Sequence, residues 1–264
     1  MIGVDVGGTF TDVVVLDEGA VTERKVPTSL HQADSVADAV SGTPEDVFLH
    51  GTTAATNALL EERGARVALV TVAGFEDVIE IGRQDRPSLY DIFADRPVPL
   101  VERGYRFGMD DDPDAVVAAL SEADAEVVAI SMLESYADPS VEADLERRCV
   151  EALAVPVLRS SLVSPEFREY ERTATTVLSA YLTPSAAGYL AALEERLPMS
   201  RRMVMTSSGG LLPFAHAPGM AGRLVLSGPA GGAVAAAALG RHHGYETVIS
   251  FDMGGTSTDC LLYT

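Results

Sequence analysis

The chain has 264 residues, 47% of them hydrophobic, and carries a formal net charge of −20. This length and composition fit one large or two modest globular domains. Lys25 is the only lysine, which argues against nucleic-acid binding because phosphate backbones require clustered positive charge. No apolar run reaches the roughly 18 residues of a membrane span, and the start lacks a basic leader. We therefore expect a cytoplasmic protein. Its scattered carboxylates are typical of a protein surface from a high-salt organism.

The first quarter of the chain predicts alternating strands and helices. Residues 2–6, 11–16 and 24–27 have the apolar runs of strands, and a helical pattern follows at about 31–40. A short strand at 47–51, a helix from 52 to about 63 and a strand at 66–71 come next. This order predicts an α/β fold with a mostly parallel core.

The middle of the chain opens with a long loop and then resumes the alternation. Residues 82–108 have three prolines and weak periodicity, which favours a functional loop or a small insertion. The pattern continues with a helix at 113–122, a strand at 127–132, a helix at 140–153 and a strand at 155–159. Two helices separated at Thr183-Pro184 are expected over about 165–197, and a strand at 202–206 follows. Cys149 and Cys260 read as packing residues.

An eight-residue motif occurs near both ends of the chain. Asp5 to Asp12 and Asp252 to Asp259 share the pattern Asp-x-Gly-Gly-Thr-x-Thr-Asp, with six of eight positions identical. Apolar runs flank each copy, so each predicts a strand, a glycine turn and a second strand. The alternative interpretation is that the two glycines do no more than allow the tight turn of a hairpin. Retention of the same carboxylates and hydroxyls in two copies favours a chemical role.

The motif has the chemistry of a phosphate site. Two glycines after a strand expose consecutive N–H groups, which favour phosphate oxygens, and threonine hydroxyls add donors. An aspartate at the strand end suits Mg²⁺ held through water, or the orientation of a nucleophile. Two facing hairpins would therefore clamp the β- and γ-phosphates of a nucleotide. A P-loop is excluded because no Gly-x-x-x-x-Gly-Lys-Ser/Thr occurs, and the Rossmann alternative is weak because the turn leads into a strand.

The duplicated hairpin resembles the actin, hexokinase and Hsp70 ATPase superfamily. More narrowly, the chain resembles the A subunit of the ATP-dependent hydantoinase/5-oxoprolinase family. Six segments carry this resemblance in order along the chain, at residues 3–12, 50–58, 82–87, 169–176, 227–232 and 251–259. The resemblance implies a ribonuclease-H-like, actin-like ATPase domain in which helices cover both faces of a mixed sheet. It implies an N-terminal domain at 1–200 with an inserted segment at 82–160. Residues 201–264 are then a linker helix and the first hairpin of a truncated second ATPase domain.

The resemblance also implies ATP- and Mg²⁺-dependent opening of a cyclic amide such as hydantoin or 5-oxoproline. Phosphorylation of the amide oxygen would be followed by attack of water, often with a B subunit. The catalytic and metal-binding carboxylates would be Asp5 and Asp252. Phosphate oxygens would be bound by Gly7, Gly8, Gly254 and Gly255, with donors from Thr9, Thr11, Thr256 and Thr258. Asp12 and Asp259 would brace the hairpins or join the metal shell.

Five further residues are candidates for binding the substrate. Thr52 and Thr53 lie between a predicted strand and a helix N-terminus, where anions bind, although plain helix capping explains them equally well. Asn57, four residues after Thr53, can face the same cleft. Arg83 and Arg86 flank a proline loop and could hold a carboxylate or phosphate; a surface ion pair is the alternative.

A polar helix segment gives the last candidates, Glu171 and Arg172. They lie among threonines, which are poor helix formers, and this misfit suggests either function or a buried polar network.

Two other functions stay open beside the cyclic amidohydrolase. One is a non-catalytic, actin-like nucleotide-binding or interaction module, and the other is the ATPase subunit of an acetone-carboxylase-like enzyme. Family A subunits continue beyond the second hairpin, so we expect unpaired strand edges there. Such edges favour homo-oligomers or hetero-oligomers and low solubility.

Overall fold

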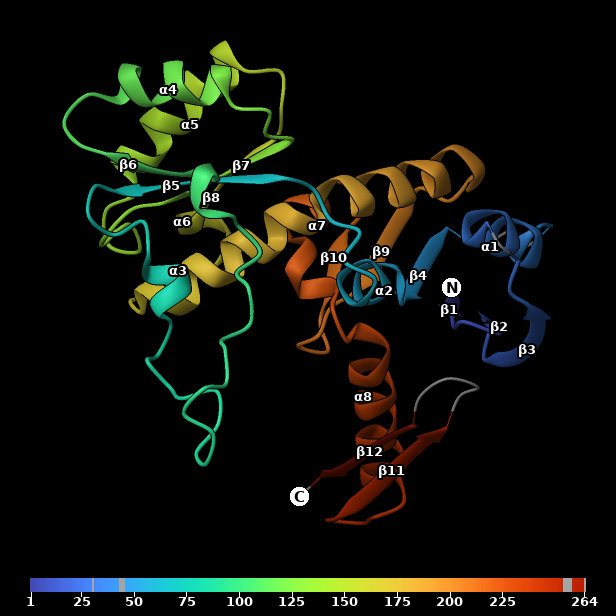
Figure 1. Ribbon diagram of the computed structural model, residues 1–264. Coiled ribbons are helices and arrows are strands. Elements are labelled where there is room, and N and C mark those ends of the chain that lie inside the picture. Colours follow the sequence, from blue (N-terminus) through green and yellow to red (C-terminus); the bar gives the residue numbers. More distant parts are fainter. Residues whose placement is uncertain (30, 43–45, 254–257, 264) are drawn as a thin grey trace. The chain divides into compact units, whose positions relative to one another are not determined.

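A computed structural model describes residues 1–29, 31–42, 46–253 and 258–263. The chain forms two compact units (Figure 1). Unit 1 comprises Met1–Arg63 and Ser185–Thr264, and unit 2 comprises Gly64–Pro184. These boundaries differ from the predicted ones at 82–160 and 200, because the strand that starts at Val67 pairs within unit 2.

The main sheet of unit 1 has six strands in the order β10-β9-β4-β1-β2-β3. The strands are β1 (Ile2–Val6), β2 (Phe10–Asp17), β3 (Ala20–Pro27), β4 (Val47–Thr52), β9 (Arg201–Met205) and β10 (Leu211–Pro213). β1, β2 and β3 form an antiparallel meander, whereas β4 is parallel to both β1 and β9. The alternate residues Ile2, Val4 and Val6 are buried, so Asp5 lies on the opposite face of β1.

The helices of unit 1 include α1 (Gln32–Val40), α2 (Ala54–Leu60) and α8 (Ser227–His242), with the short 3₁₀ helix η2 (Pro218–Leu224) before α8. The second motif copy forms a separate two-stranded sheet of β11 (Val248–Met253) and β12 (Thr258–Tyr263). This antiparallel hairpin packs on α8 and exposes Ile249, Phe251 and Met253. The mixed α/β fold with a mixed sheet is confirmed; its actin-like type stays a prediction.

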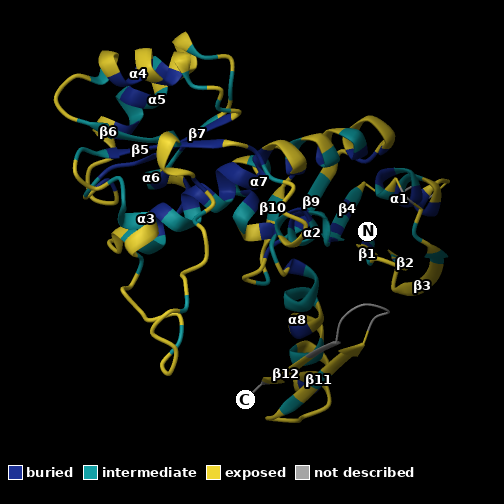
Figure 2. Cartoon of the chain, viewed as in Figure 1, coloured by how far each residue is buried: buried dark blue, intermediate teal, exposed yellow. Residues whose placement is uncertain are grey.

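Unit 2 contains a parallel sheet in the order β6-β5-β7-β8. Its strands are β5 (Val67–Val72), β6 (Arg106–Met109), β7 (Val127–Ser131) and β8 (Val157–Arg159). All five residues of β7 are buried, as expected for a strand covered on both faces (Figure 2). In Figure 1, α4 (Pro113–Glu122) and α5 (Ser140–Ala152) lie on one side of this sheet, and α6 (Ser160–Val163) lies on the other.

The long helix α7 (Glu169–Arg196) corrects the prediction of two helices. It continues through Pro184, and its two halves belong to different units. Proline removes one backbone donor from the helix. The Thr183 hydroxyl donates to the Ser179 carbonyl at 2.8 Å, a side-chain bond that α7 makes next to the proline. The helix therefore accommodates Pro184 in its interior without ending there.

The predicted loop at 82–108 is only partly irregular. After α3 (Val78–Ile81), the chain runs without helix or strand until the 3₁₀ helix η1 (Arg103–Tyr105), and it then enters β6. The prediction missed β6, the edge strand of the parallel sheet, because this strand is short and contains Gly108. Figure 2 shows most of the irregular segment as exposed.

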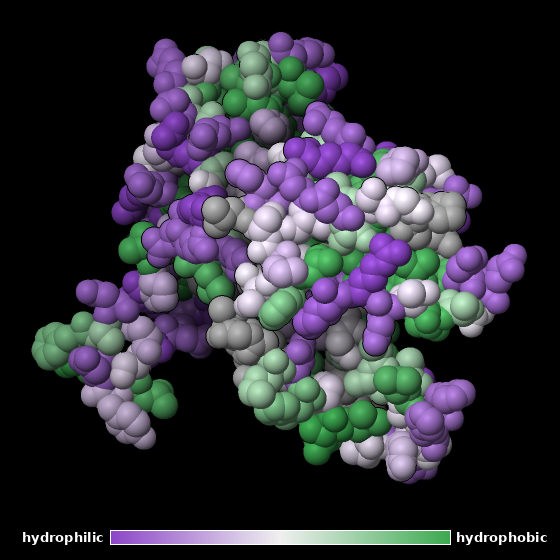
Figure 3. Space-filling model, turned by 90° about the vertical axis from the view of Figure 1, so that its right-hand side faces the viewer, coloured by the Kyte–Doolittle hydropathy of each residue, from purple (hydrophilic) through white to green (hydrophobic). Residues whose placement is uncertain are grey.

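The surface is largely polar on the face drawn in Figure 3, with apolar groups in patches between hydrophilic side chains. In the described part of the chain, no single helix has the length and apolar composition of a membrane span. One bent pair, η2 with α8 at 62°, meets that test on length and composition alone.

Candidate functional site

The β1–β2 turn is built by backbone bonds that leave its tip open. The Gly7 N–H donates to the Phe10 carbonyl at 3.0 Å, and Gly8 and Thr9 are exposed. Thr28, which follows β3, holds the turn from the side: its N–H donates to the Thr9 carbonyl at 3.0 Å, and its hydroxyl to the Gly7 carbonyl at 3.0 Å. The predicted phosphate-binding residues Gly8 and Thr9 are therefore accessible to a ligand.

Thr11 has a supporting role in this turn. Its side chain is fully buried, and its hydroxyl lies 3.0 Å from that of Thr28. Because the Thr28 proton is directed to the Gly7 carbonyl, Thr11 must be the donor in this pair. No Thr11 proton remains for a phosphate, which corrects the role predicted for this residue.

Asp5 lies at the centre of the candidate site. In the sheet it pairs with Asp12 of β2 and with Gly51 of β4. Gly51 provides the space for its carboxylate, since a Cβ at Gly51 would lie 2.5 Å from Asp5 Oδ1. Asp5 remains accessible to solvent, but protein atoms crowd it on most sides. This crowding raises the pKa of the Asp5 carboxyl, and the charges of Asp12 and Asp252 raise that pKa further.

Asp12 is paired with the chain's single lysine. Lys25 Nζ lies 2.9 Å from Asp12 Oδ1 and 3.0 Å from Oδ2 in an exposed ion pair. Lys25 also lies over the Phe10 ring at 5.3 Å. This pair ties β2 to β3 beside the turn, consistent with a bracing role for Asp12.

The second motif copy places its first aspartate near the first copy. Asp252 is exposed on β11, and its charge acts on Asp5. Within the hairpin Asp252 pairs with Asp259, just as Asp5 pairs with Asp12. Thr258 begins β12. The predicted ligands Gly254, Gly255 and Thr256 lie outside the described residues.

The arrangement around Asp5 and Asp252 fits a magnesium–nucleotide complex. The negative charge of Asp252 acts on Asp5, and a cation between the two carboxylates would offset this repulsion. Mg²⁺ prefers oxygen ligands and usually takes one or two carboxylates, completing its shell with water and phosphate oxygens. Among the described residues no group of three or more metal-binding side chains occurs, so an all-protein metal cage is not present in that part of the chain.

The β4–α2 corner adjoins Asp5. The Thr52 hydroxyl accepts from the Ala54 N–H at 3.1 Å, a local turn bond just before α2, whose N-cap residue Thr53 makes no side-chain capping bond. The Thr53 hydroxyl donates to the Val6 carbonyl at 3.4 Å, and Asn57 Nδ2 donates to Thr53 Oγ1 at 3.4 Å. Thr53 and Asn57 therefore share one side of the corner, as predicted from their spacing.

His50 and Tyr189 form a pair that sequence reasoning missed. His50 is buried; its Nδ1 lies 3.2 Å from the Val4 carbonyl and its Nε2 lies 2.8 Å from the Tyr189 hydroxyl. Burial lowers the pKa of His50 to about 4, so the ring is neutral at physiological pH. Burial raises the pKa of Tyr189. The only available signal was His50 within the segment at 50–58, because Tyr189 is 139 residues away.

The start of α8 is attached to the same corner. The Ser227 hydroxyl donates to the Thr52 carbonyl at 3.2 Å, and the Leu226 N–H donates to Thr56 Oγ1 at 3.0 Å. Leu226 has φ 59°, a left-handed conformation in which the chain turns sharply into the helix. The Ser-Gly-Pro-Ala-Gly-Gly segment therefore begins beside β4.

A cavity of about 910 Å³ opens next to the Gly8 turn. Asn57 of α2 and Tyr189 of α7 line it together with Arg63 and Arg196. Both arginines already have carboxylate partners: Arg63 with Glu61 and Arg196 with Asp34. The cavity places polar groups beside the exposed Gly8, and Asn57 is the predicted substrate residue that faces it.

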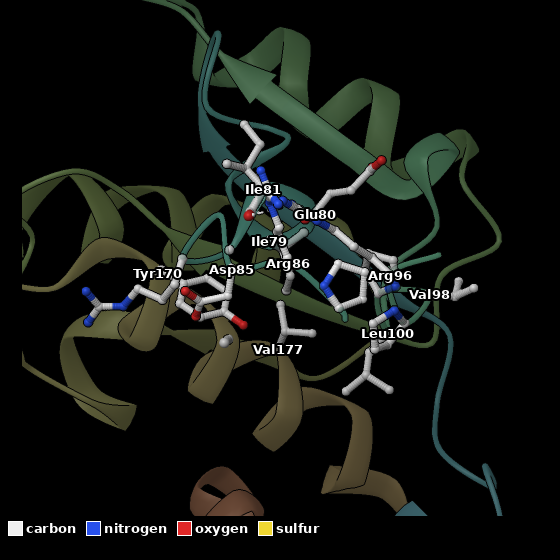
Figure 4. A pocket seen from close by; sticks show the side chains of 16 residues that line it. Ile79, Glu80, Ile81, Asp85, Arg86, Arg96, Val98, Leu100, Tyr170 and Val177 are labelled. Atoms are coloured by element: carbon white, nitrogen blue, oxygen red, sulfur yellow. Dashed lines mark hydrogen bonds between the residues drawn. The ribbon is translucent and has the colours of Figure 1, made fainter. Parts of the chain in front are cut away.

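The other substrate candidates lie in unit 2. Arg83 Nε donates to Glu171 Oε1 at 2.6 Å in an exposed pair, so the ion-pair alternative describes Arg83 and Glu171. Arg86 lines a second cavity of about 540 Å³, next to Arg96 and Tyr170 (Figure 4). Arg96 donates to the carbonyls of Glu80 and Ile81.

Arg172 belongs to a buried polar network, which corrects its predicted substrate role. Its guanidinium donates to Ser160 Oγ at 3.1 Å, the Glu166 carbonyl at 2.6 Å and the Met132 carbonyl at 2.8 Å. Glu142, also buried, accepts from the Ser160 hydroxyl at 2.6 Å and the Met132 N–H at 2.9 Å. Every nitrogen of Arg172 is occupied away from solvent, so a substrate cannot contact it.

Comparisons with known proteins agree on one family. The "Hydantoinase/oxoprolinase N-terminal region" matches residues 1–153, and the "Hydantoinase/oxoprolinase" domain matches residues 172–264. An uncharacterised protein of Methanocaldococcus jannaschii is 37% identical over 97% of this chain and 42% of its own length. The caprolactamase subunit alpha of Pseudomonas jessenii is 33% identical over 99% of this chain and 43% of its own length.

Solved structures extend the match to the fold. A nucleotide-free acetone carboxylase, from a study of ATP-dependent acetone carboxylation, superposes with a TM-score of 0.83 and 26% identity; the match covers all of this chain and 43% of the carboxylase chain. The ATP-dependent caprolactamase from P. jessenii superposes with a TM-score of 0.77 and 32% identity, covering 99% of this chain and 43% of that one. The chain thus spans about four tenths of the length of these relatives, and it belongs to the hydantoinase/oxoprolinase family.

Proposed function

We propose that this chain binds Mg²⁺-ATP for the opening of a cyclic amide of the hydantoin or 5-oxoproline type. The observation that carries the proposal is the pair of Asp-x-Gly-Gly-Thr-x-Thr-Asp hairpins, whose first aspartates, Asp5 and Asp252, lie close enough to interact electrostatically. Family membership and the caprolactamase relative support a cyclic amide as the substrate. We also infer an actin-like ATPase fold, supported by the meander followed by parallel strands.

The chain's residues suit the phosphate-binding part of this chemistry. Gly8 and Thr9 present the exposed tip of the first turn to phosphate oxygens, with Gly7 fixing its shape. Asp5 and Asp252 would hold Mg²⁺, which neutralises phosphate charge. A lactam is a poor electrophile, and transfer of the γ-phosphoryl group to its oxygen activates the ring carbon. Water then attacks that carbon, the ring C–N bond breaks with a proton going to the nitrogen, and a second water hydrolyses the resulting acyl phosphate. The products are ADP, phosphate and the open-chain amino acid.

Asn57, Arg86 and the cavity beside Gly8 are the remaining candidates for substrate contact. The cavity adjoins the proposed phosphate site, so a cyclic amide there would lie near the γ-phosphate. A B subunit is the proposed partner, because the caprolactamase relative is named as one subunit of an enzyme. The exposed apolar side chains of the β11–β12 hairpin support association with another chain.

A second candidate function is the ATPase of a carboxylase. The fit to acetone carboxylase, with its TM-score of 0.83, favours it. That carboxylation is ATP-dependent as well, so the same phosphate-binding hairpins would serve either reaction. A module that binds nucleotide without turnover is the third possibility.

An ATPase assay separates these functions. ATP hydrolysis by the chain, alone and with a B subunit, is measured with 5-oxoproline, hydantoin or caprolactam, and in parallel with acetone and bicarbonate. Stimulation by a cyclic amide supports the first proposal, and stimulation by ketone and bicarbonate supports the second. If the chain binds Mg²⁺-ATP but shows no stimulated turnover under any condition, both enzymatic functions are refuted. The non-catalytic nucleotide-binding module then remains.

A further inference from the structure

We propose that His50, Tyr189 and Thr52 form a positioning relay that fixes Asp5 for the metal-bound nucleotide. The inference rests on the proposed function. It adds His50 and Tyr189, which sequence reasoning did not assign, and gives Thr52 a positioning role in place of a substrate contact. Each of the three contacts another element, and none needs to touch the ligand. Their contribution is the geometry of the strand that carries Asp5.

The hydrogen bonds of this relay run in one direction. The Val4 carbonyl can only accept, so the neutral His50 ring carries its proton on Nδ1 and bonds that carbonyl at 3.2 Å. His50 Nε2 must then accept from the Tyr189 hydroxyl, 2.8 Å away. The Thr52 side chain lies beside the Tyr189 hydroxyl. The Tyr189 proton is used on His50, so Tyr189 could only accept from Thr52, whose oxygen itself accepts from the Ala54 N–H at 3.1 Å.

Packing holds the relay in a single arrangement. His50 and Thr52 are buried on β4. The Phe48 ring stacks on the His50 ring with centroids 5.6 Å apart, and the Tyr189 ring lies 5.6 Å from it on another side. A polar chain with buried members such as His50 and Thr52 orders its surroundings, because any misalignment leaves a buried polar group unpaired.

The relay and a second bond fix β1 on both sides of Asp5. The relay ends on the Val4 carbonyl, and the Thr53 hydroxyl reaches the Val6 carbonyl at 3.4 Å. Between these two anchors, the Asp5 carboxylate lies over Gly51, where there is no side chain. Tyr189 is also close enough for the charge of Asp5 to affect it. The frame therefore sets where the carboxylate points.

The test uses Tyr189→Phe, which removes the hydroxyl and keeps the ring. Tyr181→Phe is the matched control: it removes the same atom from another tyrosine of α7. Affinities for Mn²⁺ alone and for Mg²⁺-ATP are measured by titration calorimetry, together with the Tm. Loss of one hydrogen bond should weaken both affinities about three- to tenfold, while the control stays at the wild-type value. A purely structural role would lower the Tm and leave the affinity of the folded protein unchanged.

A second pair of variants keeps the test valid if Tyr189→Phe folds poorly. Thr52→Ser retains the hydroxyl and should bind like the wild type, whereas Thr52→Val removes it at nearly constant volume and should bind like Tyr189→Phe. Wild-type affinity in both Tyr189→Phe and Thr52→Val would overturn the relay. A wild type that fails to bind Mg²⁺-ATP would instead remove the proposed function, and a ¹⁵N spectrum of His50 with the proton on Nε2 would refute the relay independently of any ligand.

Discussion

Gly51→Ala tests whether the position of the Asp5 carboxylate matters for function. The added Cβ would lie 2.5 Å from Asp5 Oδ1 and 3.4 Å from its Cγ. To regain ordinary contact the oxygen must move by about 1 Å. Because the Asp5 side chain can rotate, the cost in stability should be small, about 1 kcal/mol. A displacement of about 1 Å in a catalytic group can lower turnover about 100-fold.

The assays separate the two effects of this substitution. Urea unfolding followed by circular dichroism measures the free energy of unfolding, and titration calorimetry with Mg²⁺-ATP measures binding, which we expect to weaken about tenfold. Gly188→Ala is the matched control, since no heavy atom lies within 4 Å of its Cβ and it sits inside α7. It should raise stability by about 0.5–1 kcal/mol. Wild-type binding and turnover in Gly51→Ala would refute the assignment of Asp5.

Three further predictions concern stability and reactivity. The pKa of His50 is lowered from 6.5 to about 4, so the unfolded chain binds its proton first as the pH falls. The folded state should lose about 3 kcal/mol between pH 6.5 and 4 in urea titrations, and His50→Gln should flatten that dependence. Arg172→Leu leaves the carbonyls of Glu166 and Met132 without the donors that Arg172 supplies and should cost about 3 kcal/mol in the same assay. Burial raises the pKa of Cys149 to about 11, whereas Cys260 is exposed. A thiol reagent should therefore label Cys260 in the native protein and Cys149 only after unfolding; native labelling of Cys149 would contradict its burial.

Local signals account for the elements that were predicted correctly. α4 follows from Asp112, whose carboxylate accepts from two N–H groups of the first turn, and from Pro113 at its first position. The glycine turn after β1 follows from Gly7 and Gly8. The wrong predictions concern residues whose surroundings depend on parts of the chain distant in sequence. Cys260 looked like a packing residue because its neighbours are apolar, yet it is exposed on β12.

The sequence alone determined the family and the two hairpins, because a duplicated motif and its flanking strands are local features that survive without knowledge of the fold. Only the tertiary structure decided which candidates share a site. Thr53 and Asn57 come next to the strand that carries Asp5 because β1 and β4 are parallel neighbours, whereas Arg172 is enclosed in the core of the other unit. Pairing between His50 and Tyr189 depends on how α7 packs against β4, and no local pattern of residues encodes a contact across 139 positions.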